Sequence, residues 1–192
     1  MPLNHHYRQS GFSYFEMMLV VFILGIVAVV AMPGLSSVSN ASRKIDLASR
    51  QIVEAIRFAQ TESIRTGNSY GVIFDKNNET IKVFVLSSNN PQYTVYHPVN
   101  KKTYTLDLNN NSHTTGVDLQ DYSIKFNKPS GWFSFFSLPS DQISFNSSGQ
   151  PKYSSKYGNG DYMLESASIT LSYAGQTRVI QISPMTGRVS LQ

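Results

Sequence analysis

A chain of 192 residues has room for one globular domain with an appendage, and its composition of 41% apolar and 15% charged residues excludes disorder throughout. It has no cysteine, which excludes a disulfide framework, a thiolate metal site and a cysteine nucleophile. The formal charge of +4 is a mild basic bias, compatible with nucleic acid or an anionic surface but requiring neither.

The N-terminus combines a short polar leader, residues 1–11, with an apolar run over residues 12–32 in which Glu16 is the one charged side chain. About 20 helical residues cover the roughly 30 Å hydrocarbon thickness of a bilayer, so residues 12–33 are long enough to span it. Because Arg8 precedes the run, the positive-inside tendency places the leader in the cytoplasm and everything after the span outside.

Three other interpretations of this run are weaker. A secretory signal peptide cut near Ala31 would have a shorter apolar region, and here a helical pattern continues well beyond it. A plain single-span anchor gives no reason for Glu16, because an ionisable group at the centre of a bilayer costs roughly 2.5–3.5 kcal/mol. A buried helix of a soluble protein would not be flanked by polar sequence on both sides. Glu16 is therefore expected to have a function.

The junction Gly11-Phe12-Ser13-Tyr14-Phe15-Glu16 resembles the processing motif of type IV prepilins, in which glycine is followed by phenylalanine and glutamate is the fifth residue after the cut. The short basic leader, the apolar helix and the helix proline, here Pro33, are part of the resemblance. It implies that prepilin peptidase cuts between Gly11 and Phe12 at the cytoplasmic face and N-methylates Phe12. Residues 13–15 depart from the Thr-Leu-Ile that is usual in the family.

The chemistry of the junction fits that resemblance. Gly11 has no side chain to obstruct a peptidase, and cleavage creates an amine at Phe12. That cation can meet a Glu16 carboxylate of a neighbouring subunit inside an apolar filament core, where a buried charge needs a partner. The staggered pairing would set the axial register between subunits.

After Pro33 the pattern becomes amphipathic. Apolar residues recur at spacings of three and four, with charged residues mostly on the other face, and Gly67 can end the helix in the left-handed conformation. The apolar positions are Ile45, Ala48, Ile52, Ala55, Ile56 and Ala59. We predict one long helix from Phe12 to about Arg65, bent or loosened at Gly25 and Pro33. Its residues 34–66 should pack against the body.

Residues 67–192 predict a β-rich domain, so the expected fold class is α+β, with a long N-terminal helix on an antiparallel sheet. Alternating apolar residues and turn signals predict strands at residues 70–74, 81–86, 104–108, 122–126, 169–173, 178–182 and 188–191. In the polar middle of the chain, about residues 87–163, the pattern defines the ends of strands least clearly. Within it, the aromatic run Trp132–Phe136 favours a buried strand or a buried loop over an exposed docking patch.

The body also resembles the GspH/FimT group of minor pilins and pseudopilins. The resemblance covers residues 43–74, which read RKIDLASRQIVEAIRFAQTESIRTGNSYGVIF, together with residues 143–149 and 169–191. It implies a minor subunit that primes a type IV pilus, a pseudopilus subunit of type II secretion, or a DNA-uptake subunit. The expected partners are other pilins or pseudopilins, the prepilin peptidase and the inner membrane, with a single span and a periplasmic C-terminal domain.

No nucleophile elbow, phosphate-binding loop or zinc-protease motif is present, so we expect no catalytic residue, cofactor or metal site. His97 and His113 lie in loop-like sequence and are expected at the surface. The candidate residues for contacts with double-stranded DNA are the basic side chains of the C-terminal third, Lys152, Lys156, Arg178 and Arg188. The ending around Arg188 has a single arginine where DNA-uptake members of the group are arginine-rich.

Overall fold

The computed structural model describes residues 13–87, 90–92, 95–127, 138–153 and 162–192, and it describes the side chains of these residues except at 29–39, 87, 90–91, 127 and 138–139. The chain divides into two compact units, Met1–Asn40 and Ala41–Gln192. The cleavage junction Gly11–Phe12, the aromatic run 132–136 and Lys156 lie outside the described residues.

A single helix, α1 (Tyr14–Thr66), is present in the described part of the chain. It is assigned without interruption through Gly25 and Pro33, and a bend at either position stays a prediction. The helix ends at Gly67, whose φ of 73° is the left-handed conformation expected of a C-terminal cap. Within the described residues, no helical stretch is both long and apolar enough to cross a membrane.

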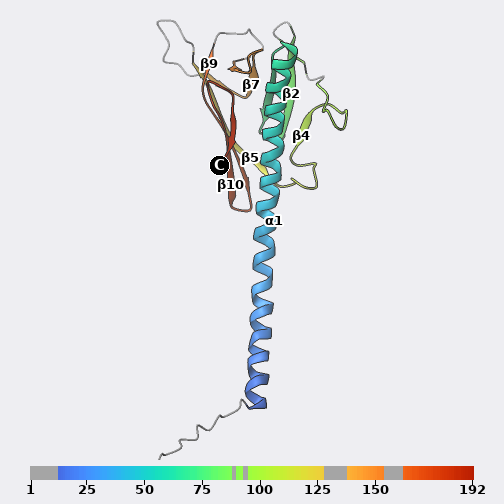
Figure 1. Cartoon of the computed structure of the whole chain (residues 1–192), viewed down its shortest axis with the longest axis vertical. Coiled ribbons are helices and arrows are strands. Elements are labelled where there is room, and N and C mark those ends of the chain that lie inside the picture. Colours follow the sequence, from blue (N-terminus) through green and yellow to red (C-terminus); the bar gives the residue numbers. More distant parts are fainter. Residues whose placement is uncertain (1–12, 88–89, 93–94, 128–137, 154–161) are drawn as a thin grey trace, which may run out of the picture. The chain divides into compact units, whose positions relative to one another are not determined.

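The described residues after α1 form an antiparallel sheet of 11 strands with the order β11-β10-β9-β8-β7-β1-β2-β3 (Figure 1). Strand β4 pairs with β2, β5 pairs with β9, and β6 pairs with β5. The strands are β1 (Tyr70–Asp75), β2 (Thr80–Ser87), β3 (Asn90–Gln92), β4 (Thr105–Asp107), β5 (Asp118–Asn127), β6 (Leu138–Ser140), β7 (Gln142–Phe145), β8 (Pro151–Lys152), β9 (Met163–Tyr173), β10 (Gln176–Ile182) and β11 (Val189–Leu191).

The two hairpins predicted from turn chemistry are confirmed. In the β1–β2 turn, Oδ1 of Asp75 accepts hydrogen bonds from the backbone N–H groups of Asn77 and Asn78, both at 3.1 Å. In the β9–β10 turn, Ala174 and Gly175 have φ of 49° and 78°, and two positive φ values match the right-handed twist of the paired strands. Strand β9 pairs with β10 and β5 through the same residues, so it is covered on both edges.

The core lies between the C-terminal half of α1 and one face of the sheet. Every apolar position predicted for that helix face is fully buried, and its partners alternate along the strands. The helix contributes Ile45, Ala48, Ile52, Ala55, Ile56 and Ala59; the sheet contributes Val72, Phe74, Val83, Ile143, Phe145, Ile169, Leu171 and Ile180 among others. The predicted α+β fold and the predicted packing face are therefore confirmed.

Two polar side chains connect the end of α1 to the sheet. Nε2 of Gln60 donates to the backbone oxygens of Gly149, at 2.8 Å, and Thr186, at 2.9 Å, so one amide holds two different turns. The hydroxyl of buried Ser63 accepts from the N–H of Tyr70 at 2.9 Å, where the chain leaves the helix and enters β1. The apolar contacts hold the helix against the sheet, and these hydrogen bonds also fix its position along the strand direction.

The middle of the chain differs most from the expectation. Strands β3, β6, β7 and β8 had not been predicted, and all are short. Strand β7 lies between β1 and β8, and each of its four residues is buried, including Gln142 and Ser144. Polar and apolar residues do alternate over these four positions, but four residues are the shortest run in which alternation indicates a strand, so the pattern alone was too weak to predict it.

Candidate functional site

The N-terminal part of α1 exposes apolar side chains on every side of the helix. Among them, Leu19 and Val20 have the lowest exposed fraction, 49%, and Tyr14 has the highest, 81%. The set comprises Tyr14, Phe15, Met17, Met18, Leu19, Val20, Val21, Phe22, Ile23, Leu24, Ile26 and Val27. An amphipathic surface helix would bury one stripe and expose polar residues on the other, and this segment has no polar stripe. We call it the apolar segment.

Glu16 is the acidic residue of the first turn of α1, where a carboxylate interacts favourably with the helix dipole. Its Oε2 accepts a hydrogen bond from the backbone N–H of Ser13 at 3.4 Å, a local contact within the first turn. The side chain is exposed, and no cation in the described part of the chain forms an ion pair with it. The carboxylate is thus available to a group from outside the chain.

The basic residues of the C-terminal third do not form one cluster in the described structure. Nε of Arg178 donates to Oδ1 of Asp46 at 2.8 Å, so this guanidinium is paired with α1. Arg188 is exposed in the β10–β11 turn, where its backbone bonds Ser183. Ser183 follows Arg178 by five residue steps, which places the two about 17 Å apart along the strand direction. Lys152 is half-buried on β8, and its backbone oxygen accepts from the hydroxyl of Ser144 at 3.0 Å.

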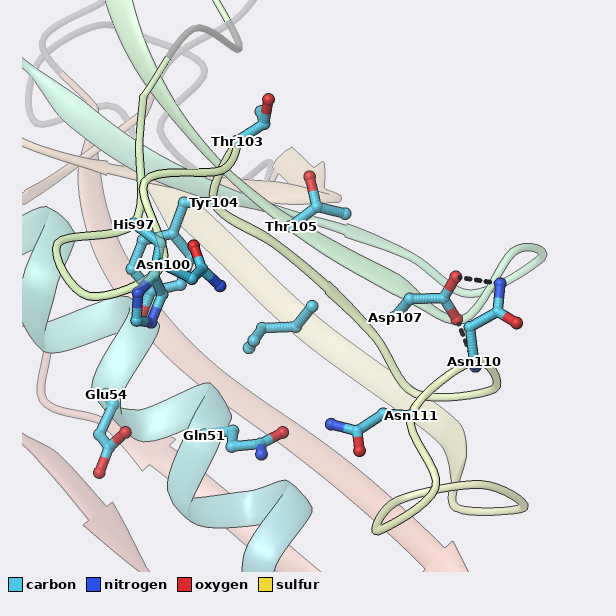
Figure 2. Close-up of a pocket in the computed structure, with 11 residues that line it drawn as sticks. Gln51, Glu54, His97, Asn100, Thr103, Tyr104, Thr105, Asp107, Asn110 and Asn111 are labelled. Atoms are coloured by element: carbon cyan, nitrogen blue, oxygen red, sulfur yellow. Dashed lines mark hydrogen bonds between the residues drawn. The ribbon is translucent and has the colours of Figure 1, made fainter.

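A polar cleft of about 390 Å³ lies between α1 and the segment that precedes and follows β4 (Figure 2). Its lining comes from Gln51 and Glu54 on the helix and from His97, Asn100, Thr103, Tyr104, Thr105, Leu106, Asp107, Asn110 and Asn111. Burial raises the pKa of the Tyr104 hydroxyl, and the negative charge of Glu54 raises it further. The sequence had placed His97 at the surface without indicating that a cleft forms beside it.

The histidines and acids do not suggest a metal centre. No group of three or more His, Asp or Glu side chains among the described residues is arranged to hold a metal ion. The ring of His97 packs 4.5 Å from that of Tyr104, and His113 is exposed with its N–H donating to Oδ1 of Asn111.

Comparison of the sequence with family models and with curated proteins gave no match. Comparison of the structure did. The minor pseudopilin EpsH from the type II secretion system of Vibrio cholerae superposes with a TM-score of 0.50 at 15% sequence identity, covering 78% of this chain and 96% of EpsH. The chain has the fold of a minor pseudopilin. The type IV minor pilin FimU of Pseudomonas aeruginosa is also similar, with a TM-score of 0.45 at 13% identity over 77% of this chain and 87% of FimU.

This fold is the one that the GspH/FimT resemblance implied. The resemblance rested on residues 43–74, 143–149 and 169–191, which contain the second half of α1, β1, β7 and most of the β9–β11 region. These elements also supply the contacts between helix and sheet, through Gln60 and through the Asp46–Arg178 pair. The passages that carried the resemblance therefore build the framework of the fold.

Proposed function

We propose that the chain is a minor pilin or pseudopilin, which prepilin peptidase cuts between Gly11 and Phe12 and N-methylates at Phe12. Residues 12–33 then hold it in the inner membrane as a single span, with the C-terminal domain in the periplasm, until it enters a pilus-like filament with other pilins. The observation that carries the proposal is the apolar segment of α1, whose side chains are exposed all round.

Such a segment needs an apolar environment on all sides. Fully burying one Val, Leu, Ile or Phe side chain is worth roughly 1.5–3 kcal/mol, and consecutive residues from Met17 to Leu24 each have about half or more of their surface exposed. Lipid supplies that environment before assembly, and the packed helices of a filament core supply it afterwards. Because both environments are apolar, burial of these side chains alone does not favour the filament over the membrane.

We expect Glu16 to make the filament more favourable than the membrane. A carboxylate in the hydrocarbon region is costly, while in the filament it can pair with the Phe12 amine of a neighbour. The described contact of Glu16, one 3.4 Å bond from the N–H of Ser13, leaves the carboxylate free for that partner. The charge thus favours assembly and fixes where each subunit stops along the axis.

The decisive experiment is the intact mass of the protein from cells with and without prepilin peptidase. With the peptidase, the mass should correspond to residues 12–192 with one added methyl group, and without it to the full chain. The variant Gly11→Val, which places a branched side chain at the cut, should stay unprocessed. A mature form that retains residues 1–11, or one cut near Ala31, would sink the proposal.

The kind of filament is a separate question. The likeness to EpsH favours a secretion pseudopilus, while the leader and helix suit a type IV pilus equally well. A deletion strain separates them: a pilus role predicts loss of sheared surface pili with normal protein secretion, and a pseudopilus role predicts the reverse. DNA uptake through Lys152, Lys156, Arg178 and Arg188 is a second candidate activity, favoured by the exposed position of Arg188.

A further inference from the structure

The polar cleft beside α1 has hydrogen-bonding groups that the fold does not use. It belongs wholly to the second unit of the chain, and its volume of about 390 Å³ falls within the roughly 300–1,000 Å³ typical of small-molecule pockets. Such pockets are usually lined by apolar side chains, and here amides, hydroxyls and carboxylates predominate. The lining therefore indicates a polar ligand.

The loop wall of the cleft offers N–H donors with fixed orientation. Oδ1 of Asn100 accepts from the N–H of Lys102 at 3.0 Å, and Oδ1 of Asn111 accepts from the N–H of His113 at 3.1 Å. Since each oxygen is engaged in its own turn, each amide keeps an NH₂ group that no described residue accepts. Nδ1 of His97 accepts from the N–H of Val99 at 3.1 Å, so the neutral ring carries its proton on Nε2.

The helix wall offers acceptors. Gln51 and Glu54 stand one turn apart on α1, and Figure 2 shows the Gln51 side chain extending toward Asn111. The carboxylate of Asp107 is not available in the same way. Its oxygens accept from the N–H groups of Asn109 and Asn110 and from Nδ2 of Asn110, at 2.9 to 3.2 Å. Asp107 thus holds the turn that forms one end of the cleft.

A small apolar surface completes the lining. The ring of Tyr104 is held between Phe58, with centroids 5.0 Å apart, and His97, at 4.5 Å. Leu106, half-buried, follows two residues later in the chain and lines the cleft as well. The cleft therefore combines donors, acceptors and a limited apolar contact.

We propose that this cleft binds a neutral saccharide. Hydroxyl groups both donate and accept, so a sugar can use the amide N–H groups of the loop wall together with the oxygens of Gln51 and Glu54. A phosphate or carboxylate ligand would meet the negative charges of Glu54 and Asp107. A cationic ligand would meet the N–H donors of Asn100, Asn111 and His97. An apolar ligand would leave most of these groups without partners.

The test uses the full chain in a detergent that contains no sugar, with saturation-transfer difference NMR. The probes are tri-N-acetylchitotriose, maltotriose and lactose, with inorganic phosphate and a lysine-rich peptide as charged competitors. At least one saccharide should show saturable binding that neither competitor displaces. Gln51→Ala should weaken that binding by about tenfold, because donors of the ligand lose an acceptor. Glu54→Gln, which keeps an acceptor oxygen, should bind more tightly than Glu54→Ala.

The matched control is Arg50→Ala, a neighbouring exposed residue of the same helix that does not line the cleft, and it should bind like the original protein. Circular dichroism of each variant checks that the fold is kept. The proposal is overturned if none of the three saccharides binds, if either charged competitor displaces the bound saccharide, or if Gln51→Ala binds like Arg50→Ala. Filament assembly plays no part in this measurement, so its outcome is independent of the proposed function.

Discussion

Asp46 and Arg178 form an ion pair that joins α1 to strand β10, with Nε of the arginine 2.8 Å from Oδ1 of the aspartate. The two residues are 132 positions apart in sequence, and their side chains keep 38% and 31% of their surface exposed. The pair therefore connects α1, the first element of the chain, with β10 near its C-terminal end. It also engages the arginine that the sequence had suggested for DNA.

The ion pair should stabilise the domain modestly. Because the pair is partly exposed, we expect Asp46→Ala to lower the free energy of unfolding by about 0.5–1 kcal/mol, measured by urea denaturation of the full chain in detergent. Glu62→Ala is the control. It breaks the 2.6 Å pair with Arg65 one helical turn away on the same helix, and it should cost less than Asp46→Ala because the guanidinium of Arg65 is exposed to solvent. Equal losses for both variants would show that the link between α1 and β10 adds nothing.

Gly71 in β1 should tolerate no side chain. A Cβ there would lie 2.5 Å from the backbone oxygen of Ile143 and 2.5 Å from the ring of Phe84, and the backbone oxygen belongs to a paired strand that cannot give way. Gly71→Ala should therefore destabilise the domain by about 3 kcal/mol. Gly175→Ala is the comparison, since its φ of 78° strains alanine but no atom lies within 4 Å. It should cost only about 1 kcal/mol. A smaller loss at Gly71 than at Gly175 would contradict the packing described here.

Glu16→Ala should separate processing from assembly. The variant should be cut and inserted normally, because an uncharged span enters a bilayer at least as easily. Its incorporation into filaments should fall, since the Phe12 amine of the neighbour loses its partner. Quantitative immunoblots of membrane and sheared-filament fractions measure both steps. Glu16→Asp, which keeps the charge on a shorter side chain, should recover part of the incorporation. Normal assembly of Glu16→Ala would exclude the register role.

Glu79 should give the domain a distinctive pH dependence. Its burial, followed by the nearby negative charge of Asp118 and then of Asp107, raises its pKa from the ordinary value of 4.5, and its Oε2 is buried with no partner among the described residues. The folded state therefore holds this proton more tightly than the unfolded state. Its contribution to stability is present at about pH 4.5 and is lost as pH rises through the folded pKa.

Glu79→Gln tests this dependence. The variant should be more stable than the original protein at pH 7.5, and the difference should shrink as pH falls toward 5. The pKa of Asp75 shifts in the opposite direction, because hydrogen bonds from Asn78 lower it below 3.8. Its titration therefore does not change the stability between pH 5 and 7.5. Thermal unfolding of both proteins at several pH values gives the comparison. A difference that did not change between pH 5 and 7.5 would mean that Glu79 does not titrate as described.

Binding of double-stranded DNA should be weak and strongly dependent on salt. Two to four phosphate contacts predict a log–log slope of roughly −2 to −4. Arg188→Gln should reduce that slope by about one, whereas Arg178→Gln should change it less because Asp46 already engages the guanidinium. Arg65→Gln, whose side chain pairs with Glu62, is the matched control. A fluorescence titration with a labelled duplex at two salt concentrations measures the slopes. No binding at low salt, or an unchanged slope for Arg188→Gln, would exclude DNA contacts at this end.

Local patterns predicted much of the fold. The buried face of α1, from Ile45 to Ala59, follows from apolar residues at helical spacing, and the cap at Gly67 follows from its freedom to adopt a positive φ. The β9–β10 hairpin follows from the Ala174-Gly175 turn between alternating strands. In each case the residues that determine the element are neighbours in sequence, so a short window contains the whole cause.

Distant pairings were not predictable in this way. Strand β5 pairs with β9 with register shifts near Leu119 and Lys125, which disturb the alternation that would mark a ten-residue strand. Ser144 can be buried because its hydroxyl donates to the backbone of Lys152 on the next strand. The partner of Arg178 is much more distant, since Asp46 lies 132 positions away in sequence. The cleft forms because loops without a recognisable sequence motif lie against α1, so the sequence alone did not predict it.

The pairing of β1 with β7 has a consequence for how the chain is made. Tyr70 opposes Phe145 and Val72 opposes Ile143, so the inner edge of β1 stays open until more than seventy further residues have been synthesised. Until then the growing chain exposes the buried face of α1 together with an unpaired strand edge, which is the condition that favours aggregation. Closing so long a loop is slow compared with forming the local β1–β2 hairpin. Chaperones that bind the incompletely synthesised chain should therefore act after β2 has been synthesised and before β7 has been.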